Sequence, residues 1–222
     1  MEDEATMRVC LDVCCGKGGV TQSFREHDDW QVIGIDSEKK FFQHWQGKNL
    51  SFIRADIRTV DWHELKEQLP KIDLLWASPP CTHFSLANLT FPREGVQEAL
   101  EIVGSCFEAV AILKPRFYMI ENPRARLRHF LPKPSMTIFY SDWDKAYPCQ
   151  KPTDLWSNFS LLMAPMKRRP SYGKGIKVHE DRHHLWGKIL KGNAATRAMV
   201  PKGVSNAVLE VVERRLDEEI KP

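Results

Sequence analysis

Short apolar runs recur through the first 120 residues, and each ends at a glycine, a proline or an acidic residue. These runs predict buried strands at Arg8–Val13, Gln31–Ile35, Ser51–Ile53, Ile72–Trp76 and Phe117–Ile120. Runs of three to six mostly apolar residues are typical of parallel strands that are covered on both faces. Segments of helical character separate them at Val20–Glu26, Lys39–Gln46, Asp61–Gln68 and Gly95–Leu113. The alternation predicts a doubly wound, mostly parallel α/β sheet.

The pattern changes after residue 123. A basic, proline-bearing loop precedes one short apolar run, Met136–Tyr140, which predicts a strand. The stretch Tyr147–Asn158 mixes prolines with aromatic residues, and Met166–His184 is basic and irregular. Val204–Ile220 then places its valines on one stripe and predicts an amphipathic helix. We therefore expect a small, irregular, β-containing insertion followed by a closing helix.

Composition narrows the class of protein. The chain has 222 residues and a formal net charge of +3, which permits a nucleic-acid partner without requiring one. No apolar run approaches the roughly 20 residues of a membrane span, and no signal peptide precedes the first strand. The six cysteines lack the paired spacing of a disulfide framework. We expect an intracellular, cytoplasmic protein of prokaryotic or viral type, without membrane contact.

A glycine-rich turn follows the first strand and suits a cofactor. Cys14 to Gly19 reads CCGKGG and leads into a helical segment. Such a turn lets the backbone approach a ligand at a helix start. Asp36, about 20 positions later at the tip of the second strand, is placed to bind ribose hydroxyls. Asp56 follows the third strand in the same way. The alternatives are a plain tight turn and acidic helix caps.

A cysteine and a glutamate follow the next two strands. Cys81 comes directly after Ser78-Pro79-Pro80, whose prolines end the strand and stiffen the loop. A thiol at the carboxyl edge of a parallel sheet is a candidate nucleophile. Glu121 follows the strand Phe117–Ile120, where a carboxylate has either a buried partner or a chemical role. The alternatives are a small buried cysteine and a glutamate that caps a turn or pairs with Arg124 or Arg126.

The basic insertion offers a nucleic-acid surface. Lysines and arginines stand among Trp143, Tyr147, Trp156 and Tyr172, which would stack bases while the cations follow phosphates. A solvated loop around a small core explains the same composition. Three histidines (His179, His183 and His184) could form a metal site with Cys149, but no CxxC pair or HExxH motif accompanies them, so no metal is expected.

Together, LDVCCGKGG, the Asp36 and Asp56 turns, SPPCTHFS and IENP resemble the S-adenosylmethionine-dependent cytosine-5 DNA methyltransferases. The resemblance runs from Met7 to about Leu127, with a weaker echo near Arg197–Leu209. Its specific part is Pro-Pro-Cys with Phe84-Ser85, followed about 40 residues later by Glu-Asn. It implies a Rossmann-like methyltransferase fold and a covalent reaction in which the thiolate of Cys81 adds to C6 of cytosine.

The resemblance also implies residue roles. Cys81 would be the nucleophile, and Glu121 would contact N3 and the exocyclic amine of the base. S-adenosylmethionine would be held by Asp12, Cys14, Gly16, Gly18, Gly19, Asp36, Ser37, Asp56, Ile57 and Pro79. DNA would be contacted by Ser85, Arg124, Arg126 and Lys151.

Three departures from the family pattern concern nucleotide positioning. Thr82 stands where the family usually has Gln, and Pro123 where it usually has Val. No clear Gln-x-Arg-x-Arg element is present; Gln150-Lys151-Pro152 is the nearest candidate.

The resemblance predicts three parts: a catalytic domain over 1–130, a reduced target-recognition segment over 131–195 and a C-terminal segment over 196–222 that packs back on the catalytic domain. The insertion has only about 65 residues. This implies short or relaxed sequence recognition on duplex or single-stranded DNA, an accessory protein, or an unusual substrate.

Three other functions remain open at this stage. The same chemistry could act on RNA. Ser-Pro-Pro also occurs in amino-methyltransferases, but those place an aromatic residue where this chain has Cys81. A non-catalytic cofactor- or nucleic-acid-binding module would need neither Cys81 nor Glu121. The target sequence and the oligomeric state cannot be read from the sequence.

Overall fold

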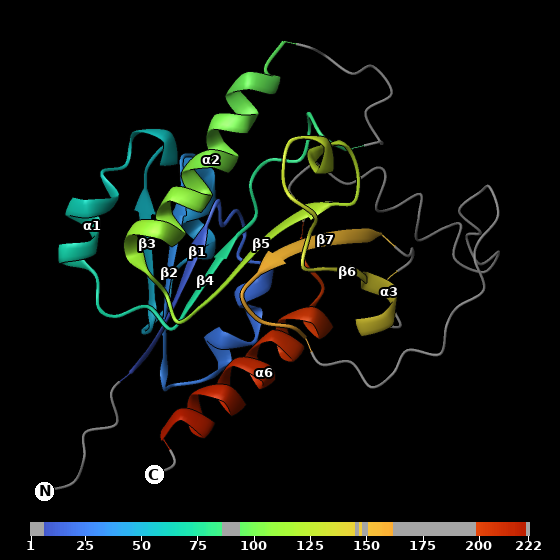
Figure 1. The fold of residues 1–222 in the computed structure, drawn as a ribbon. Helices are drawn as coiled ribbons and strands as arrows, with labels where there is room; N and C mark the ends of the chain where they lie inside the picture. Colours follow the sequence, from blue (N-terminus) through green and yellow to red (C-terminus); the bar gives the residue numbers. More distant parts are fainter. Residues whose placement is uncertain (1–6, 86–93, 145–146, 148–150, 162–198, 221–222) are drawn as a thin grey trace, which may run out of the picture.

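The sheet has seven strands, in the order β3-β2-β1-β4-β5-β7-β6. The computed structural model describes residues 7–85, 94–144, 147, 151–161 and 199–220. The strands are β1 Arg8–Val13, β2 Trp30–Asp36, β3 Leu50–Arg54, β4 Leu74–Ala77, β5 Phe117–Pro123, β6 Met136–Phe139 and β7 Pro152–Ser157. The first five are parallel, and β7 and β6 continue the sheet antiparallel (Figure 1). The predicted doubly wound, mostly parallel sheet is confirmed.

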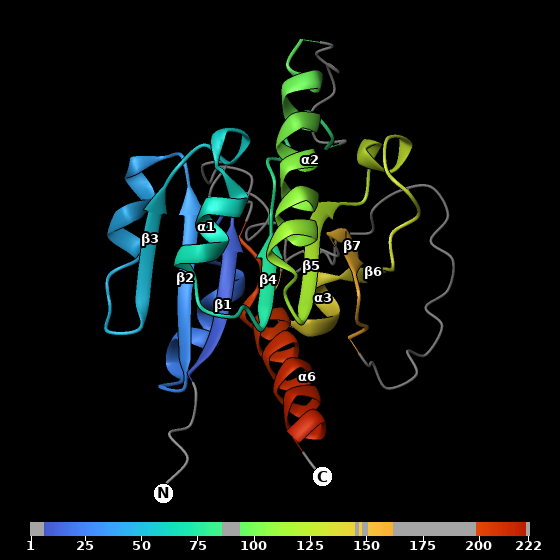
Figure 2. The same cartoon turned by 60° about the vertical axis from the view of Figure 1, so that its left-hand side comes forward.

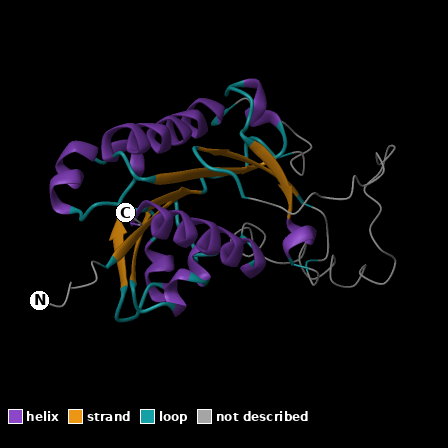
Figure 3. Cartoon of the chain, turned by 60° about the horizontal axis from the view of Figure 1, so that its bottom comes forward, coloured by secondary structure: helices purple, strands orange, loops and turns teal. Residues whose placement is uncertain are grey.

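Helices cover both faces of this sheet, as Figure 3 shows. The α-helices are α1 Trp62–Gln68, α2 Val96–Leu113, α3 Tyr140–Trp143 and α6 Lys202–Ile220. Short 3-10 helices lie at Val20–Gln22, Phe24–Glu26, Lys39–His44, Ile57–Thr59 and Arg126–His129. Helices α1 and α2 lie on one face, and α6 crosses the other (Figure 2). None of the helices in the described ranges is long and apolar enough to cross a membrane.

Alternation along β1 divides the core into two halves. Leu11 and Val13 face the side of α2, whereas Cys10 faces α6, because successive side chains of a strand point to opposite faces. The α6 half packs Trp30 and Trp76 against the valine stripe of α6. The amphipathic pattern that predicted this helix therefore reflects its burial on the sheet.

Local signals explain where several elements begin and end. The Asp61 carboxylate caps α1, accepting from the backbone N–H groups of His63 and Glu64 at 2.9 and 3.0 Å. Helix α2 ends at Leu113, and its C-cap residue Lys114, immediately before Pro115, has a left-handed φ of 51°. The predicted helical segment, Gly95–Leu113, ends at the same residue.

The structure corrects three predicted elements. Val20–Glu26 was expected as one helix but forms two 3-10 turns joined at Ser23, whose backbone N–H donates to Ser205 of α6 at 3.0 Å. Tertiary contact here replaces an intrahelical bond. The segment Lys39–Gln46 is likewise a 3-10 helix, Lys39–His44. The predicted strand Met136–Tyr140 ends at Phe139, because Tyr140 begins α3.

The described strands of the insertion extend the main sheet. No strand was predicted within Tyr147–Asn158, yet β7 lies there and pairs with β5, and β6 pairs with β7. Residues 162–198 lie outside the described part of the chain. The catalytic sheet therefore includes strands from beyond residue 131.

Candidate active site

The candidate residues gather at the carboxyl edge of the parallel strands. Strands β1 and β4 are neighbours, and the chain leaves β1 toward β2 and leaves β4 toward β5, on opposite sides. This is the topological switch point at which ligands bind in open α/β sheets. The glycine turn follows β1 there, and the Pro-Pro-Cys loop follows β4. Asp36 ends β2, and Glu121 lies in the last part of β5.

The glycine turn is held at one residue from both sides. The N–H of Gly16 donates to Asp36 Oδ2 at 2.9 Å, and its C=O accepts from Trp45 Nε1 at 2.9 Å. Gly16 and Gly18 have φ values of 51° and 74°, which favour glycine. A Cβ on Gly16 would meet no atom within 4 Å, so the backbone at Gly16 faces open space. The backbone there is both fixed and accessible.

Asp12 lies buried near the end of β1 with an unsatisfied oxygen. Its Oδ2 has no hydrogen-bond partner within the described structure. Burial raises the pKa of Asp12 well above its ordinary range, while the nearby Arg25 guanidinium opposes that rise. A buried carboxylate without a donor is costly. It fits a ligand that brings a cationic donor to this turn.

Arg25 and Trp45 brace the turn, although neither was among the predicted site residues. The Arg25 guanidinium lies 4.1 Å from the centre of the Trp45 ring, and its Nη1 donates to the His44 carbonyl at 2.8 Å. Trp45 fits because a Cβ on Gly34 would lie 2.6 Å from its ring. Only the glycine within strand β2 signalled this close approach in the sequence.

Asp36 is anchored by backbone donors on both carboxylate oxygens. Oδ1 accepts from the Glu38 N–H at 2.9 Å, and Oδ2 accepts from Gly16. Burial raises the pKa of Asp36, and these two donors act against that shift. Each oxygen keeps a further lone pair for a ligand hydroxyl. Ser37, next in the chain, is exposed, and its carbonyl accepts from Arg54 Nε at 3.4 Å.

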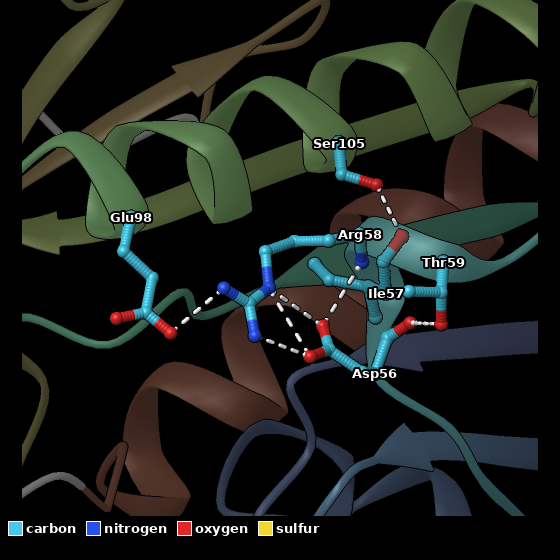
Figure 4. Close-up of polar contacts among 6 residues, drawn as sticks. All are labelled: Asp56, Ile57, Arg58, Thr59, Glu98 and Ser105. Atoms are coloured by element: carbon cyan, nitrogen blue, oxygen red, sulfur yellow. Dashed lines mark hydrogen bonds and ion pairs between the residues drawn. The ribbon is translucent and has the colours of Figure 1, made fainter.

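The Asp56 carboxylate is engaged in local contacts. It accepts from the Arg58 backbone N–H at 3.1 Å and forms an ion pair with the Arg58 guanidinium, which also contacts Glu98 of α2 at 2.7 Å (Figure 4). These bonds lower the pKa of Asp56. The adjoining Ile57 is buried, and its carbonyl accepts from Ser105. Asp56 therefore caps a 3-10 helix, one of the two roles considered for it, and its contact with S-adenosylmethionine stays a prediction.

Cys81 lies in a turn that is tied down on both sides. Its carbonyl accepts from the N–H groups of Phe84 and Ser85 at 3.0 and 2.8 Å. On the preceding side, Pro79 is buried, and its carbonyl accepts from Asn122 Nδ2 at 3.1 Å. Cys81 itself is half-buried. A stiff turn with a partly accessible thiol suits a nucleophile.

Glu121 lies at the same height along the sheet as Ser78, which precedes the Cys81 turn. The β4–β5 register pairs Ala77 with Ile120, so Ser78 and Glu121 come next along neighbouring strands. Glu121 is only 5% exposed, and its Oε1 accepts from the Tyr140 hydroxyl at 3.0 Å. Burial raises the pKa of Glu121, against the opposing effects of Lys151, Tyr140 and Ser78. A carboxyl group that can carry a proton nearer neutral pH suits acid–base work.

The arginines after β5 do three different things. Arg126 joins the Cys81 turn to this segment: its N–H donates to Phe84 O and its Nη1 to Ser85 O, each at 3.1 Å. Arg128 turns inward and pairs with Asp154, which has no exposed surface. Arg124 is exposed. The contacts of Arg126 and Arg128 are made within the protein.

Lys151 lies close to Tyr140 and acts on Glu121. Its Nζ is 4.7 Å from the centre of the Tyr140 ring, and its charge acts on Glu121. Sequence reasoning missed Tyr140 and Ser78, because a tyrosine ending an apolar run and a serine before two prolines carry no catalytic signal. Cys149 and the three histidines weighed for a metal, His179, His183 and His184, lie outside the described residues.

The chain is similar to several known proteins. Residues 9–131 match the family model for the C-5 cytosine-specific DNA methylases. A protein of Frog virus 3 (isolate Goorha) named "Probable DNA (cytosine-5)-methyltransferase" is 25% identical over 195 residues, which are 76% of this chain and 83% of that protein. "Type II methyltransferase M.DdeI" of Desulfomicrobium norvegicum is 25% identical over 114 residues, 50% of this chain but only 27% of its own length.

A solved structure supports the fold. The crystal structure titled "putative DNA modification methyltransferase", encoded within an E. coli prophage, superimposes with a TM-score of 0.51 at 15% identity. It covers 68% of this chain and 46% of that one. The matched family model spans more than half of the chain, from β1 through the Cys81 turn to beyond the end of the Glu121 strand. The chain belongs to the C-5 cytosine-specific DNA methylases, the DNA cytosine-5 methyltransferases whose methyl donor is S-adenosylmethionine.

Proposed function

We propose that this chain methylates C5 of cytosine through a covalent bond between Cys81 Sγ and C6 of the base, with Glu121 as the acid–base partner. The β4–β5 register carries the proposal. It sets Glu121 beside Ser78, three residues before Cys81, at the edge where the glycine turn also opens. A module that only binds its ligands has no use for a stiffened thiol near a buried carboxyl group whose pKa is raised.

S-adenosylmethionine would bind at the part of the carboxyl edge that is formed by the ends of β1 and β2. Asp12 offers an unsatisfied carboxylate oxygen to the α-amino group, and the open face of Gly16 admits the methionine chain. Asp36 keeps lone pairs for ribose hydroxyls, and we assign Pro79, at the start of the Cys81 turn, to contact with the methyl donor. The cofactor supplies an electrophilic methyl group on a sulfonium. The contacts of Cys14, Gly18, Gly19, Ser37, Asp56 and Ile57 belong to the same proposal.

The protein's part in the reaction is to make C5 nucleophilic. The thiolate of Cys81 adds to C6, and Glu121 supports protonation at N3, so the ring electrons become available at C5. C5 then takes the methyl group as the sulfonium–methyl bond breaks, which leaves S-adenosylhomocysteine. A base removes the C5 proton, the Sγ–C6 bond breaks, and the C5–C6 double bond returns.

The cytosine must leave a base stack to reach Cys81. A base inside a duplex is out of reach of a side chain at this depth, so the target is flipped out or already single-stranded. Ser85 and the exposed Arg124 lie on the segments next to the nucleophile, where they would contact the phosphate backbone. We assign Arg126 to holding the Cys81 turn from within, so its effect on DNA would be indirect.

Target recognition is assigned to the insertion, residues 131–195, within which β6 and β7 join the catalytic sheet. Its small size favours a short target or help from an accessory protein. Residues 196–222, including α6, would support the cofactor turn, because a Cβ on Gly19 would lie 2.7 Å from the Val200 nitrogen. We expect a cytoplasmic enzyme.

The test is methyl transfer from tritiated S-adenosylmethionine to DNA and, in parallel, to RNA. Wild-type protein should yield labelled 5-methylcytosine in DNA. Cys81→Ser and Glu121→Gln should each lose at least about a hundredfold in kcat, the scale at which removal of a general acid–base group is felt. Both variants should retain binding of S-adenosylhomocysteine. Label that persists in Cys81→Ser would contradict the covalent route, and label confined to RNA would change the substrate.

A further inference from the structure

Glu121 receives help from two residues that no family motif supplied. Tyr140 is the first residue of α3, directly after β6, and Lys151 is the residue directly before β7. Tyr140 is buried and donates its hydroxyl proton to Glu121 Oε1 at 3.0 Å. Lys151 is half-buried, with its Nζ 4.7 Å from the centre of the same tyrosine ring. Three separate segments therefore meet at one carboxyl group.

Lys151 adopts a backbone conformation that its sequence disfavours. Its φ is 33°, on the left-handed side, and Pro152 follows it. A residue before proline prefers an extended conformation, and a lysine with positive φ is uncommon. Residues held in such conformations cluster at functional sites, where the surrounding structure imposes them. Here the conformation accompanies an ammonium group placed against Tyr140.

The family's Gln-x-Arg-x-Arg element has no clear counterpart in this chain. Its absence gives Lys151 and Tyr140 a role beside Glu121. In the nearest candidate, which starts at Gln150, the two arginine positions hold Pro152 and Asp154. Asp154 is buried and is bound by Arg128 and Thr137. Among the residues that the structure describes, the cationic side chain that acts on Glu121 is Lys151 rather than an arginine. We propose that Tyr140 and Lys151 are positioning residues for Glu121: the tyrosine hydroxyl fixes the carboxyl group, and the lysine ammonium balances its charge.

The two residues suit these roles chemically. Burial, and then the neighbouring Glu121 carboxylate, raise the pKa of Tyr140 well above its ordinary value, so its hydroxyl remains a donor. Ser78 comes directly after β4, next to Glu121 in the β4–β5 register, and accepts from Trp76 Nε1 at 2.7 Å, which leaves its own proton for the carboxylate. The groups facing Glu121 are thus Tyr140, Ser78 and Lys151, with Tyr147 behind Tyr140 at 5.3 Å between ring centres.

Both residues act on Glu121 in the same direction. A hydroxyl donor and a cation each favour the ionised carboxylate, whereas burial favours the protonated form. Their removal should therefore raise the pKa of Glu121 further. This inference rests on the proposed role of Glu121, but its effect on titration does not depend on methyl transfer.

The direct test is a carboxyl-carbon NMR titration of protein labelled with 13C at glutamate carboxyl groups. Glu121→Gln assigns the Glu121 signal by its loss. The midpoint of that signal should move to higher pH in Tyr140→Phe and in Lys151→Met, and return to the wild-type value in Lys151→Arg. Tyr118→Phe is the matched control, since Tyr118 lies on β5 but packs against the opposite face of the sheet.

Kinetics on the full chain adds a second readout. Tyr140→Phe should lower kcat about tenfold, while KM for DNA and Kd for S-adenosylhomocysteine change less than about twofold. An unmoved Glu121 midpoint in Tyr140→Phe would overturn the inference, even if kcat fell. If that variant does not fold, Lys151→Met and Lys151→Arg carry the same test. If the Glu121 midpoint shifts in the variants but the wild-type protein transfers no methyl group, the proposed function is overturned and this inference stands.

Discussion

The side-chain amide of Asn122 donates a hydrogen bond to the main-chain carbonyl of Pro79 at 3.1 Å, and Asn122 has no exposed surface. This bond joins the strand that carries Glu121 to the loop that carries Cys81. Asn122 neighbours the glutamate in sequence, and Pro79 lies two residues before the cysteine. The spacing between the two proposed catalytic groups therefore depends on this buried contact.

Asn122→Ala should uncouple the loop from the strand. The Pro79 carbonyl would lose its buried donor, which costs about 1–3 kcal/mol of unfolding free energy, and kcat should fall by at least about tenfold as Cys81 shifts. Asn158→Ala is the matched control, because Asn158 makes similar bonds to Arg116 and Tyr118 at the other end of β5. Urea unfolding and methyl-transfer assays should show a stability loss in both variants but a large kcat loss in Asn122→Ala alone.

Arg128 and Arg124 should separate stability from DNA binding. Arg128→Met leaves the fully buried Asp154 without its cation and should cost about 3–5 kcal/mol of unfolding free energy. Arg124→Met, at an exposed position, should change stability by less than about 0.5 kcal/mol, yet weaken DNA binding and flatten its salt dependence. Denaturant melts and fluorescence anisotropy at two salt concentrations measure both. Equal stability of the two variants would refute the inward role of Arg128.

Asp12→Asn should stabilise the free protein at neutral pH and weaken cofactor binding. Burial raises the pKa of Asp12 in the folded state above its unfolded value, so the ionised aspartate opposes folding above the folded pKa. The amide removes this cost. The thermal midpoint of Asp12→Asn should therefore exceed that of wild type at pH 7.5, and the gain should vanish as the pH falls to about 4.

Calorimetric binding of S-adenosylhomocysteine supplies the second half of the Asp12 test. The affinity should fall for Asp12→Asn, because the amide cannot neutralise the α-amino group of the ligand. Unchanged affinity together with a raised thermal midpoint would mean that Asp12 is merely a buried charge, without a part in holding the cofactor.

The sequence predicted the parallel strands and their common carboxyl edge, but it did not predict most of the side-chain contacts at that edge. Apolar runs ending at Pro79 or at the glycine turn are local signals, and the parallel strands follow from them. The two 3-10 turns around Ser23 were not foreseeable, because Ser205 of α6, far along the chain, supplies the bond that breaks the helix. Asp56 shows the opposite limit: its position after a strand suggested a ligand, yet its carboxylate binds Arg58.

The partners of Glu121 were hidden for the same reason. Tyr140 and Lys151 reach it only because β7 returns antiparallel beside β5, and no periodic pattern announced that strand. Cys81 and Glu121 themselves were predicted from the short motifs around them, which can be recognised independently of long-range packing.

Covalent trapping tests the central claim most directly. Wild-type protein, S-adenosylmethionine and DNA containing 5-fluorocytosine should give a stable protein–DNA adduct, because fluorine at C5 cannot leave as the proton does. Peptide mass spectrometry should place the bond on Cys81, and Cys81→Ser should give no adduct while still binding S-adenosylhomocysteine. An adduct on another residue, or 5-methylcytosine formed by Cys81→Ser, would contradict the account.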